Sequence, residues 1–255
     1  MLIALDARHE RARVEATRDL PPSLFRCPGC DGEVILKRGK VVLPHFAHRP
    51  PFDCEWASES MFHLEAKSDL VGVLRERGWA CDPEVQLAPS RIVDVLATDP
   101  STGRRLGIEV QASQISVEEM KQRISVDRRC GVTTGWLFTH DRLFNSLWVA
   151  ALSGSHDKVR VPEEVAYLQL RYGIGVFIKW PTDEPALDIL RFRLSRSWSD
   201  GSEFYDEYGD WVSHPPRQLI RTFDIIECTR LRSAMPQMAL GRWSEDWTVG
   251  FGATE

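Results

Sequence analysis

The alternation of apolar and polar positions predicts a small β module at the start of the chain. Residues 1–20 alternate weakly, which predicts one or two short strands before the Pro21-Pro22 break. Between residues 25 and 54 the pattern predicts a cysteine knuckle followed by a β-hairpin. Its strands are expected at residues 34–36 and 41–43, with a turn at residues 37–40.

A helical period follows this module and then gives way to strands. Apolar positions predict a helix over residues 58–77, with Ser58 as N-cap and Gly78 as terminator. A capping box at residues 116–119 predicts a second helix that ends at Gly131. The expected strands lie near 84–87 and at 91–98, 106–111 and 134–139, with a turn at 99–103. This order predicts an α/β domain.

The rest of the chain shows weaker patterns. Helices are expected at residues 147–153 and 162–170, and a buried strand at 174–180. Beyond Pro181 the sequence is acidic, contains several Trp and Pro residues, and has no clear period. We therefore divide the chain into an N-terminal module (1–57), a core (58–145) and a C-terminal extension (146–255).

Composition narrows the class of protein. With 255 residues, of which 43% are hydrophobic and 27% charged, the chain can bury a sizeable core. No apolar run approaches the roughly 20 residues of a membrane helix, and residues 1–6 do not resemble a secretion signal, so we expect a cytoplasmic protein. The net charge is −5, but residues 1–50 carry nine Lys or Arg and six Asp or Glu. One basic face for a polyanion is compatible with that distribution.

Two acidic residues lie inside apolar strands. Asp94 is flanked by Val93 and Val95, and Glu109 by Ile108 and Val110. A buried, unpaired carboxylate costs several kcal/mol, so each needs a partner. A hairpin that turns about residues 101–102 places the two acids opposite each other, where they could hold one hard cation such as Mg²⁺ or Mn²⁺. The alternative is that both are ordinary solvent-exposed edge-strand acids.

The first predicted helix carries ionisable residues on its apolar face. Glu59, His63 and Lys67 follow one another at intervals of four, on the stripe that should face the sheet. Three such residues predict a polar site shared with the strands. Pairing among themselves at the edge of the domain is the alternative.

Clustered cysteines and histidines around the predicted hairpin indicate that the N-terminal module is zinc-ribbon-like and binds zinc. Five candidates are available for a four-coordinate site: Cys27, Cys30, His45, His48 and Cys54. We favour Cys27, Cys30, His48 and Cys54, with His45 as the possible substitute. A closed site of this kind is structural, because no coordination position is open for chemistry. The remaining cysteines of the six are scattered, which is typical of buried hydrophobic residues.

Taken in order, these motifs resemble two related families. Glu59, Asp94 and the Glu109-Val110-Gln111 strand resemble the PD-(D/E)XK nuclease signature, except that Gln111 stands where that signature usually has Lys. Residues 25–140 more closely resemble the CoiA family of competence proteins. The resemblance rests on the Cys-Pro-Gly-Cys and His-Phe-Ala-His motifs, the helix with Glu59, His63 and Lys67, and the strands with Asp94 and Glu109.

The resemblance implies a restriction-endonuclease-like core that acts on DNA in uptake and recombination. It implies that Asp94, Glu109 and Glu59 hold Mg²⁺ or Mn²⁺, and that Lys67, Gln111 and His63 assist. We expect an endo- or exodeoxyribonuclease that hydrolyses phosphodiester bonds. The alternative is a catalytically inactive DNA-binding protein of the same fold. A third hypothesis, a protein-binding regulatory module, rests only on the Trp-rich C-terminal section.

Overall fold

The computed structural model describes most of the first 139 residues and parts of the remainder. The described residues are 1–50, 53–54, 56, 59–139, 158–160, 162–172, 176–179, 187–194, 198–218 and 222–231. The expected helix at residues 147–153 lies outside them. Among the described helices, none has the length and apolar character needed to cross a membrane.

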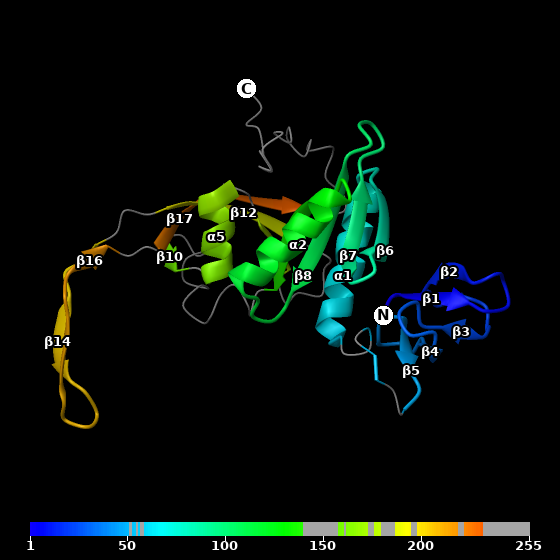
Figure 1. Ribbon diagram of the computed structural model, residues 1–255, viewed down its shortest axis with the longest axis horizontal. Coiled ribbons are helices and arrows are strands. Elements are labelled where there is room, and N and C mark those ends of the chain that lie inside the picture. Colours follow the sequence, from blue (N-terminus) through cyan, green and yellow to red (C-terminus); the bar gives the residue numbers. More distant parts are fainter. Residues whose placement is uncertain are drawn as a thin grey trace.

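The N-terminal module is a small antiparallel sheet. Its strands are β1 (Ile3–Asp6), β2 (Ala12–Glu15), β3 (Phe25–Arg26), β4 (Glu33–Lys37) and β5 (His45–His48). They pair in the order β2-β1-β3-β4-β5. Figure 1 shows this module in blue beside the N-terminal end of the first helix. One or two short strands were expected within residues 1–20, and the structure has two there, β1 and β2.

The predicted hairpin partner was wrong. β4 pairs with residues 45–48, so that Val34 lies opposite His48, and residues 41–43 belong to the connection. Val41 is 96% exposed, whereas Phe46 is buried against Phe25 with ring centroids 5.0 Å apart. Burial of the Phe46 ring therefore outweighs the β propensity of the valines.

The remaining elements build one large mixed sheet with helices packed on it (Figure 1). In chain order they are α1 (Met61–Glu76), β6 (Ala80–Ala88), β7 (Arg91–Thr98), β8 (Arg105–Gln111), α2 (Val117–Arg129), β9 (Thr133–Thr139), β10 (Lys158–Arg160), α5 (Glu163–Tyr172), β11 (Val176–Lys179), β12 (Leu187–Leu194) and β17 (Thr222–Leu231). The strand order is β10-β17-β12-β11-β9-β8-β7-β6. β9 is parallel to both β8 and β11, and the other pairs are antiparallel, so the α/β class is confirmed.

Strands from beyond residue 146 continue this sheet. β11 pairs with β9, and β12 and β17 follow it. The expected strand and second helix of that region correspond to β11 and α5. A separate hairpin of β14 (Ser202–Tyr205) and β15 (Trp211–His214) projects at the far end of the molecule, near the short pair β13 (Trp198–Ser199) and β16 (Arg217–Gln218) (Figure 1).

The helices begin and end largely where their caps predict. Ser60, and not Ser58, is the N-cap of α1, and its hydroxyl accepts a hydrogen bond from the His63 amide. Gly78 ends this helix with a φ of +84°, as predicted. The Ser116 hydroxyl caps α2, also as predicted.

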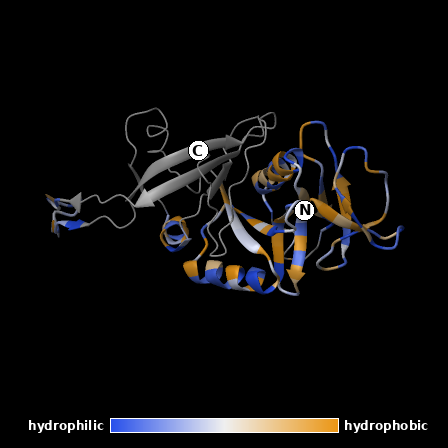
Figure 2. Cartoon of the chain, turned by 90° about the horizontal axis from the view of Figure 1, so that it is seen from above, coloured by the Kyte–Doolittle hydropathy of each residue, from blue (hydrophilic) through white to orange (hydrophobic). Residues whose placement is uncertain are grey.

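Packing of α1 on the sheet forms the main core. Leu70, Val71 and Leu74 bury against Ile108 and Val110 of β8. Alternate residues of a strand point to opposite faces, so Glu109 and Gln111 face away from α1 and toward α2. In Figure 2 the strands lie between helices on either side. One face of β8 is therefore apolar and packs on α1, whereas the other face carries polar side chains.

Candidate functional site

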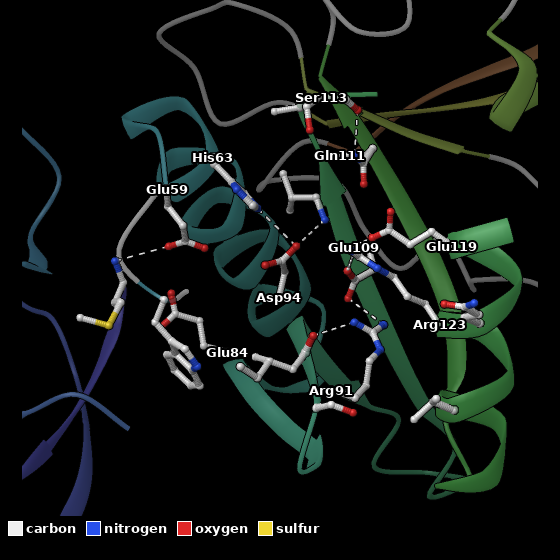
Figure 3. A pocket seen from close by; sticks show the side chains of 18 residues that line it. Glu59, His63, Glu84, Arg91, Asp94, Glu109, Gln111, Ser113, Glu119 and Arg123 are labelled. Carbon is white, nitrogen blue, oxygen red and sulfur yellow. Dashed lines mark hydrogen bonds and ion pairs between the residues drawn. The ribbon is translucent and has the colours of Figure 1, made fainter. Parts of the chain in front are cut away.

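The acidic site forms where β7 and β8 separate. Their pairing follows the predicted register up to Val95 opposite Ile108 and stops there. Beyond that point the carboxylate of Asp94 accepts a hydrogen bond from the Val110 amide at 2.8 Å, where a backbone carbonyl would continue the ladder. The separated strands border an open cavity of about 600 Å³ (Figure 3).

Three potential metal ligands meet at one side of this cavity. One ligand atom each of Glu59, His63 and Asp94 lies within 4.8 Å of the others. His63 Nε2 lies 3.3 Å from Asp94 Oδ2, and Figure 3 shows the two side chains directed toward each other. Burial lowers the pKa of His63, but the hydrogen bond to Asp94 and the nearby carboxylate charges outweigh it and raise the pKa above its ordinary value.

Lys67 neutralises the acids from inside the protein. Its side chain is fully buried, and its ammonium donates hydrogen bonds to Glu59 and, at 2.6 Å, to Glu84. Asp94 Oδ1 lies 3.9 Å from the same nitrogen. Burial would raise the pKa of Asp94, yet the His63 hydrogen bond and the Lys67 charge hold it below its usual range. Lys67 therefore helps to keep Glu84 and Asp94 ionised.

Glu84 is a site residue that the sequence did not reveal. It is 3% exposed, and its carboxylate accepts hydrogen bonds from the backbone amides of Leu2 at 2.8 Å and Ile3 at 3.0 Å as well as from Lys67. Its φ is +55°, a left-handed conformation that costs a non-glycine residue about 1–2 kcal/mol. The sequence signal, an acid after Pro83 in a weakly alternating stretch, did not predict burial.

Glu109 is held by two arginines on the other side of the cavity. Its oxygens lie 2.9 Å from Arg91 Nη2 and 2.5 Å from Arg123 Nη1. Burial and the negative charge of Asp94 nevertheless raise the pKa of Glu109, despite both cations. Figure 3 shows Glu109 and Arg123 together beside α2. Glu109 therefore lies near Asp94 but does not belong to the Glu59–His63–Asp94 group, and a cation shared by Asp94 and Glu109 stays a prediction.

A buried ion pair fixes Arg91. Its guanidinium donates two hydrogen bonds of 2.8 Å to Asp127 of α2, and Thr134 of β9 donates a third to the same carboxylate. Bidentate pairs of this kind hold both partners in one orientation. The site residues on β7 and β8 are thus tied to α2, and neither Arg91 nor Arg123 was among the residues predicted for the site.

Gln111 lines the cavity but makes a local contact. Its side-chain amide donates a hydrogen bond of 2.7 Å to the Ser113 carbonyl, and the residue is 7% exposed. No positive charge is therefore present at the position where the nuclease signature usually has Lys.

The Glu59–His63–Asp94 group has donors that fit a divalent cation. Oε2 of Glu59 is buried and accepts no hydrogen bond from the residues that the structure describes, although the Met1 amino group lies 3.4 Å away. Carboxylate oxygens suit Mg²⁺ and Mn²⁺, and the imidazole favours Mn²⁺ over Mg²⁺. The residues present therefore fit such an ion.

The second candidate metal site lies in the N-terminal module. Cys27, Cys30, His48 and Cys54 each place one ligand atom within 4.8 Å of the others, which is the favoured set of four. Cys27 and Cys54 have sulfurs 3.8 Å apart, and Cys30 Sγ lies 3.3 Å from His48 Nε2. Zn–S bonds of about 2.3 Å in a tetrahedron give a sulfur separation of about 3.8 Å, so the cluster could bind zinc.

His45 does not join this cluster. Its Nδ1 donates a hydrogen bond to the Leu43 carbonyl at 2.9 Å. Burial raises the pKa of the Cys27 thiol to about 12, so a bound cation would be needed to make it a thiolate near neutral pH.

Comparison with known proteins matches two parts of the chain, the N-terminal module and the region that contains the acidic site, to one family. The N-terminal domain of competence protein CoiA matches residues 8–57, and the CoiA nuclease-like domain matches residues 59–153. Competence protein CoiA of Bacillus subtilis (strain 168) is 29% identical over 123 residues, which are 47% of this chain and 32% of the relative. The match thus spans about a third of the relative's length. No solved structure matches the chain. The chain belongs to the CoiA-like family and carries that family's nuclease-like domain.

Proposed function

We propose that this protein is a metal-dependent nuclease that hydrolyses phosphodiester bonds in DNA, on a core of the restriction-endonuclease type. The observation that carries the proposal is the convergence of Glu59, His63 and Asp94 in an open cavity that also contains Arg123. Carboxylates that can hold a cation, next to a partly exposed guanidinium, are the groups that bind and activate a phosphodiester. The name of the relative further supports a role in competence.

The roles of the residues follow from their contacts. Asp94 and Glu59 would hold Mg²⁺ or Mn²⁺ with His63, and the metal would lower the pKa of a bound water and stabilise charge on the phosphate. Lys67 pairs with Glu59 and keeps Asp94 ionised, and it supplies the cation that is missing at position 111. Glu109, which was predicted to hold the cation together with Asp94, orients Arg123.

Arg123 is the residue best placed to receive phosphate. It is 32% exposed, lines the cavity, and pairs with Glu109 and with the half-exposed Glu119. The contact with Glu119 is a surface pair of a kind worth about 0–1 kcal/mol, so a phosphate oxygen can replace it at small cost.

We further propose that the Cys27–Cys30–His48–Cys54 cluster binds one structural zinc ion. All four ligand positions would be filled by protein, which leaves no position for catalysis. The zinc would hold together a module whose own core is small and which docks on Glu84.

Cleavage of a panel of DNA forms tests this function. Wild-type protein should cut at least one single-stranded, double-stranded or branched DNA when Mn²⁺ or Mg²⁺ is present. Asp94→Asn and Glu59→Gln should abolish cutting and weaken Mn²⁺ binding, measured separately by calorimetry. Glu118→Gln is the matched control, because Glu118 is 76% exposed on α2 and does not line the cavity. Equal cutting by wild type and Asp94→Asn would refute the proposal.

Gln111 supports a second candidate, a DNA-binding protein without catalysis. The amide cannot replace the charge of a Lys, and it is engaged by Ser113. If wild-type protein binds DNA but cuts no form with either cation, and binding survives Asp94→Asn, this second function is the better account.

A further inference from the structure

A second cavity adjoins the acidic site and is lined mainly by the N-terminal module. It measures about 370 Å³ and shares Met1, Trp56 and Glu59 with the first cavity. Its size is at the lower end of the range of ligand pockets, which is about 300–1,000 Å³. Trp56 therefore lies at the boundary between the two cavities.

Trp56 is held in place by the cysteine knuckle. Its ring lies directly on Gly29: a Cβ at that position would be 2.5 Å from two atoms of the indole. The backbone of Trp56 also hydrogen-bonds the Cys54 thiol, and the ring packs against the core of the N-terminal module. Contacts with Gly29 and Cys54 therefore hold the indole of Trp56, which is only partly buried and lines both cavities.

Cationic groups line the second cavity beyond Trp56. Lys37 and Arg49 come from β4 and from the residue after β5, and both are exposed. Arg49 pairs with Glu33 at 3.2 Å, and the two side chains are 64% and 41% exposed. Such a pair contributes about 0–1 kcal/mol, so phosphate can replace Glu33 as its partner. An aromatic platform with cations next to it is the arrangement that binds single-stranded nucleic acid.

We propose that Trp56 stacks on an unpaired base of the DNA substrate, and that Lys37 and Arg49 bind the phosphates that follow it. This inference rests on the proposed DNA substrate and narrows it to single-stranded DNA or to DNA with an unpaired end. A base in a duplex is already stacked and paired, so its face cannot lie on an indole without being unpaired first. The zinc module thus selects the strand that enters the acidic site.

Binding of a labelled oligonucleotide tests the proposal apart from catalysis. The assay uses full-length, zinc-loaded protein carrying Asp94→Asn, with no added Mg²⁺ or Mn²⁺, and compares a single strand with the same sequence as a duplex. The test variant carries Trp56→Leu in addition to Asp94→Asn. The leucine keeps apolar packing on Gly29 but lacks an aromatic face. Stacking of one base predicts about 5- to 150-fold weaker binding of the single strand and unchanged binding of the duplex. Unchanged single-strand affinity in a variant that retains zinc would overturn the proposal.

Trp56→Phe covers the case in which the leucine variant loses zinc. The smaller ring should keep most of the affinity, while the quenching of tryptophan fluorescence by the oligonucleotide should fall. Trp211→Phe is the control, because Trp211 is 55% exposed on the distant β14–β15 hairpin (Figures 1 and 2) and should leave quenching intact. Quenching that persists in Trp56→Phe would also overturn the proposal.

The salt dependence of binding tests the cations. Lys37→Ala should reduce the slope of log affinity against log salt concentration by about 0.7, the value for one phosphate contact on a single strand. Lys40→Ala is the control, because Lys40 lies in the connection that follows β4 and lines neither cavity, so this change should leave the slope unchanged. Equal slopes for both variants would overturn the Lys37 contact. If Trp56 stacks on a base but the wild-type protein cuts no DNA, the proposed nuclease function is refuted and this inference stands. If the wild-type protein cuts DNA but Trp56 does not stack, this inference alone is refuted.

Discussion

Replacing Lys67 by Met should strongly destabilise the protein near neutral pH. The substitution keeps an unbranched side chain of similar length but removes a buried charge that contacts Glu59, Glu84 and Asp94. Glu84 would keep the amides of Leu2 and Ile3, so its carboxylate would not lose every donor. The three acids would, however, be left close together, with His63, the Met1 amino group and Arg13 as the remaining nearby cations among the described residues.

The expected cost is about 3–5 kcal/mol in the free energy of unfolding, the range for removing one partner of a buried ion pair. The depressed pKa values of Glu84 and Asp94 give the effect a pH dependence. A carboxylate with a lowered folded-state pKa stabilises the protein above its ordinary pKa and loses that contribution as the pH falls. The difference between wild type and Lys67→Met should therefore be largest near pH 7 and shrink below about pH 4.

Urea unfolding at several pH values without divalent cations measures this difference. Lys121→Met is the matched control, because Lys121 is 52% exposed on α2 and pairs with an exposed Glu118, so its loss should cost less than about 1 kcal/mol. A Lys67→Met protein within about 1 kcal/mol of wild type at pH 7 would refute the role given to Lys67. A difference that does not shrink in acid would refute the electrostatic explanation.

Cys30→Ser should lower the zinc content from about one ion per chain and lower the thermal midpoint, because a structural zinc site contributes to folding. Metal analysis measures the zinc content, and calorimetry measures the thermal midpoint. A zinc-free protein with wild-type stability would contradict this prediction. His63 must be neutral to bind a cation, and its pKa is raised, so the affinity for Mn²⁺ should fall up to about tenfold per pH unit below that pKa. Titrations with Mn²⁺ from pH 5 to 8 should show this fall for the wild type but not for His63→Asn. A wild-type affinity that does not change with pH would exclude His63 as a ligand. Deleting residues 181–255 should lower the thermal midpoint, because β11 loses β12 as its partner; a truncated protein as stable as the full chain would show that these strands contribute little.

Local patterns in the sequence were enough to predict the parts of the site that depend on spacing. The turn at residues 99–103 fixed the register of β7 and β8, since hairpin pairing follows from where the chain turns. The Cys27–Cys30–His48–Cys54 cluster was predictable because two of its four residues lie three positions apart and the other two follow within 25 residues. The capping residue Ser116 marked the start of α2.

Contacts between distant elements were not predictable in this way. The sequence shows Asp94 and Glu109 in opposed positions but not that the strands separate beyond Val95, which directs Asp94 toward α1 while Glu109 meets Arg91 and Arg123. The two arginines lie on β7 and α2, and nothing in their neighbours distinguishes them from surface cations. The strands beyond residue 146 carried weak patterns, so their place in the same sheet was also missed.

Glu84 makes the two parts of the chain interdependent. Its carboxylate accepts the amides of Leu2 and Ile3 from β1, and its carbonyl accepts a hydrogen bond from Arg13 at 2.8 Å, so the N-terminal sheet is fixed to the core at this residue. The same carboxylate holds Lys67, which in turn contacts Glu59 and Asp94. If the N-terminal module loses its fold, Glu84 loses the two amide donors that stabilise its buried charge and its left-handed backbone. Loss of zinc should therefore disturb the acidic site even though no zinc ligand belongs to it, and a core cut free at residue 58 should bind Mn²⁺ more weakly than the full chain.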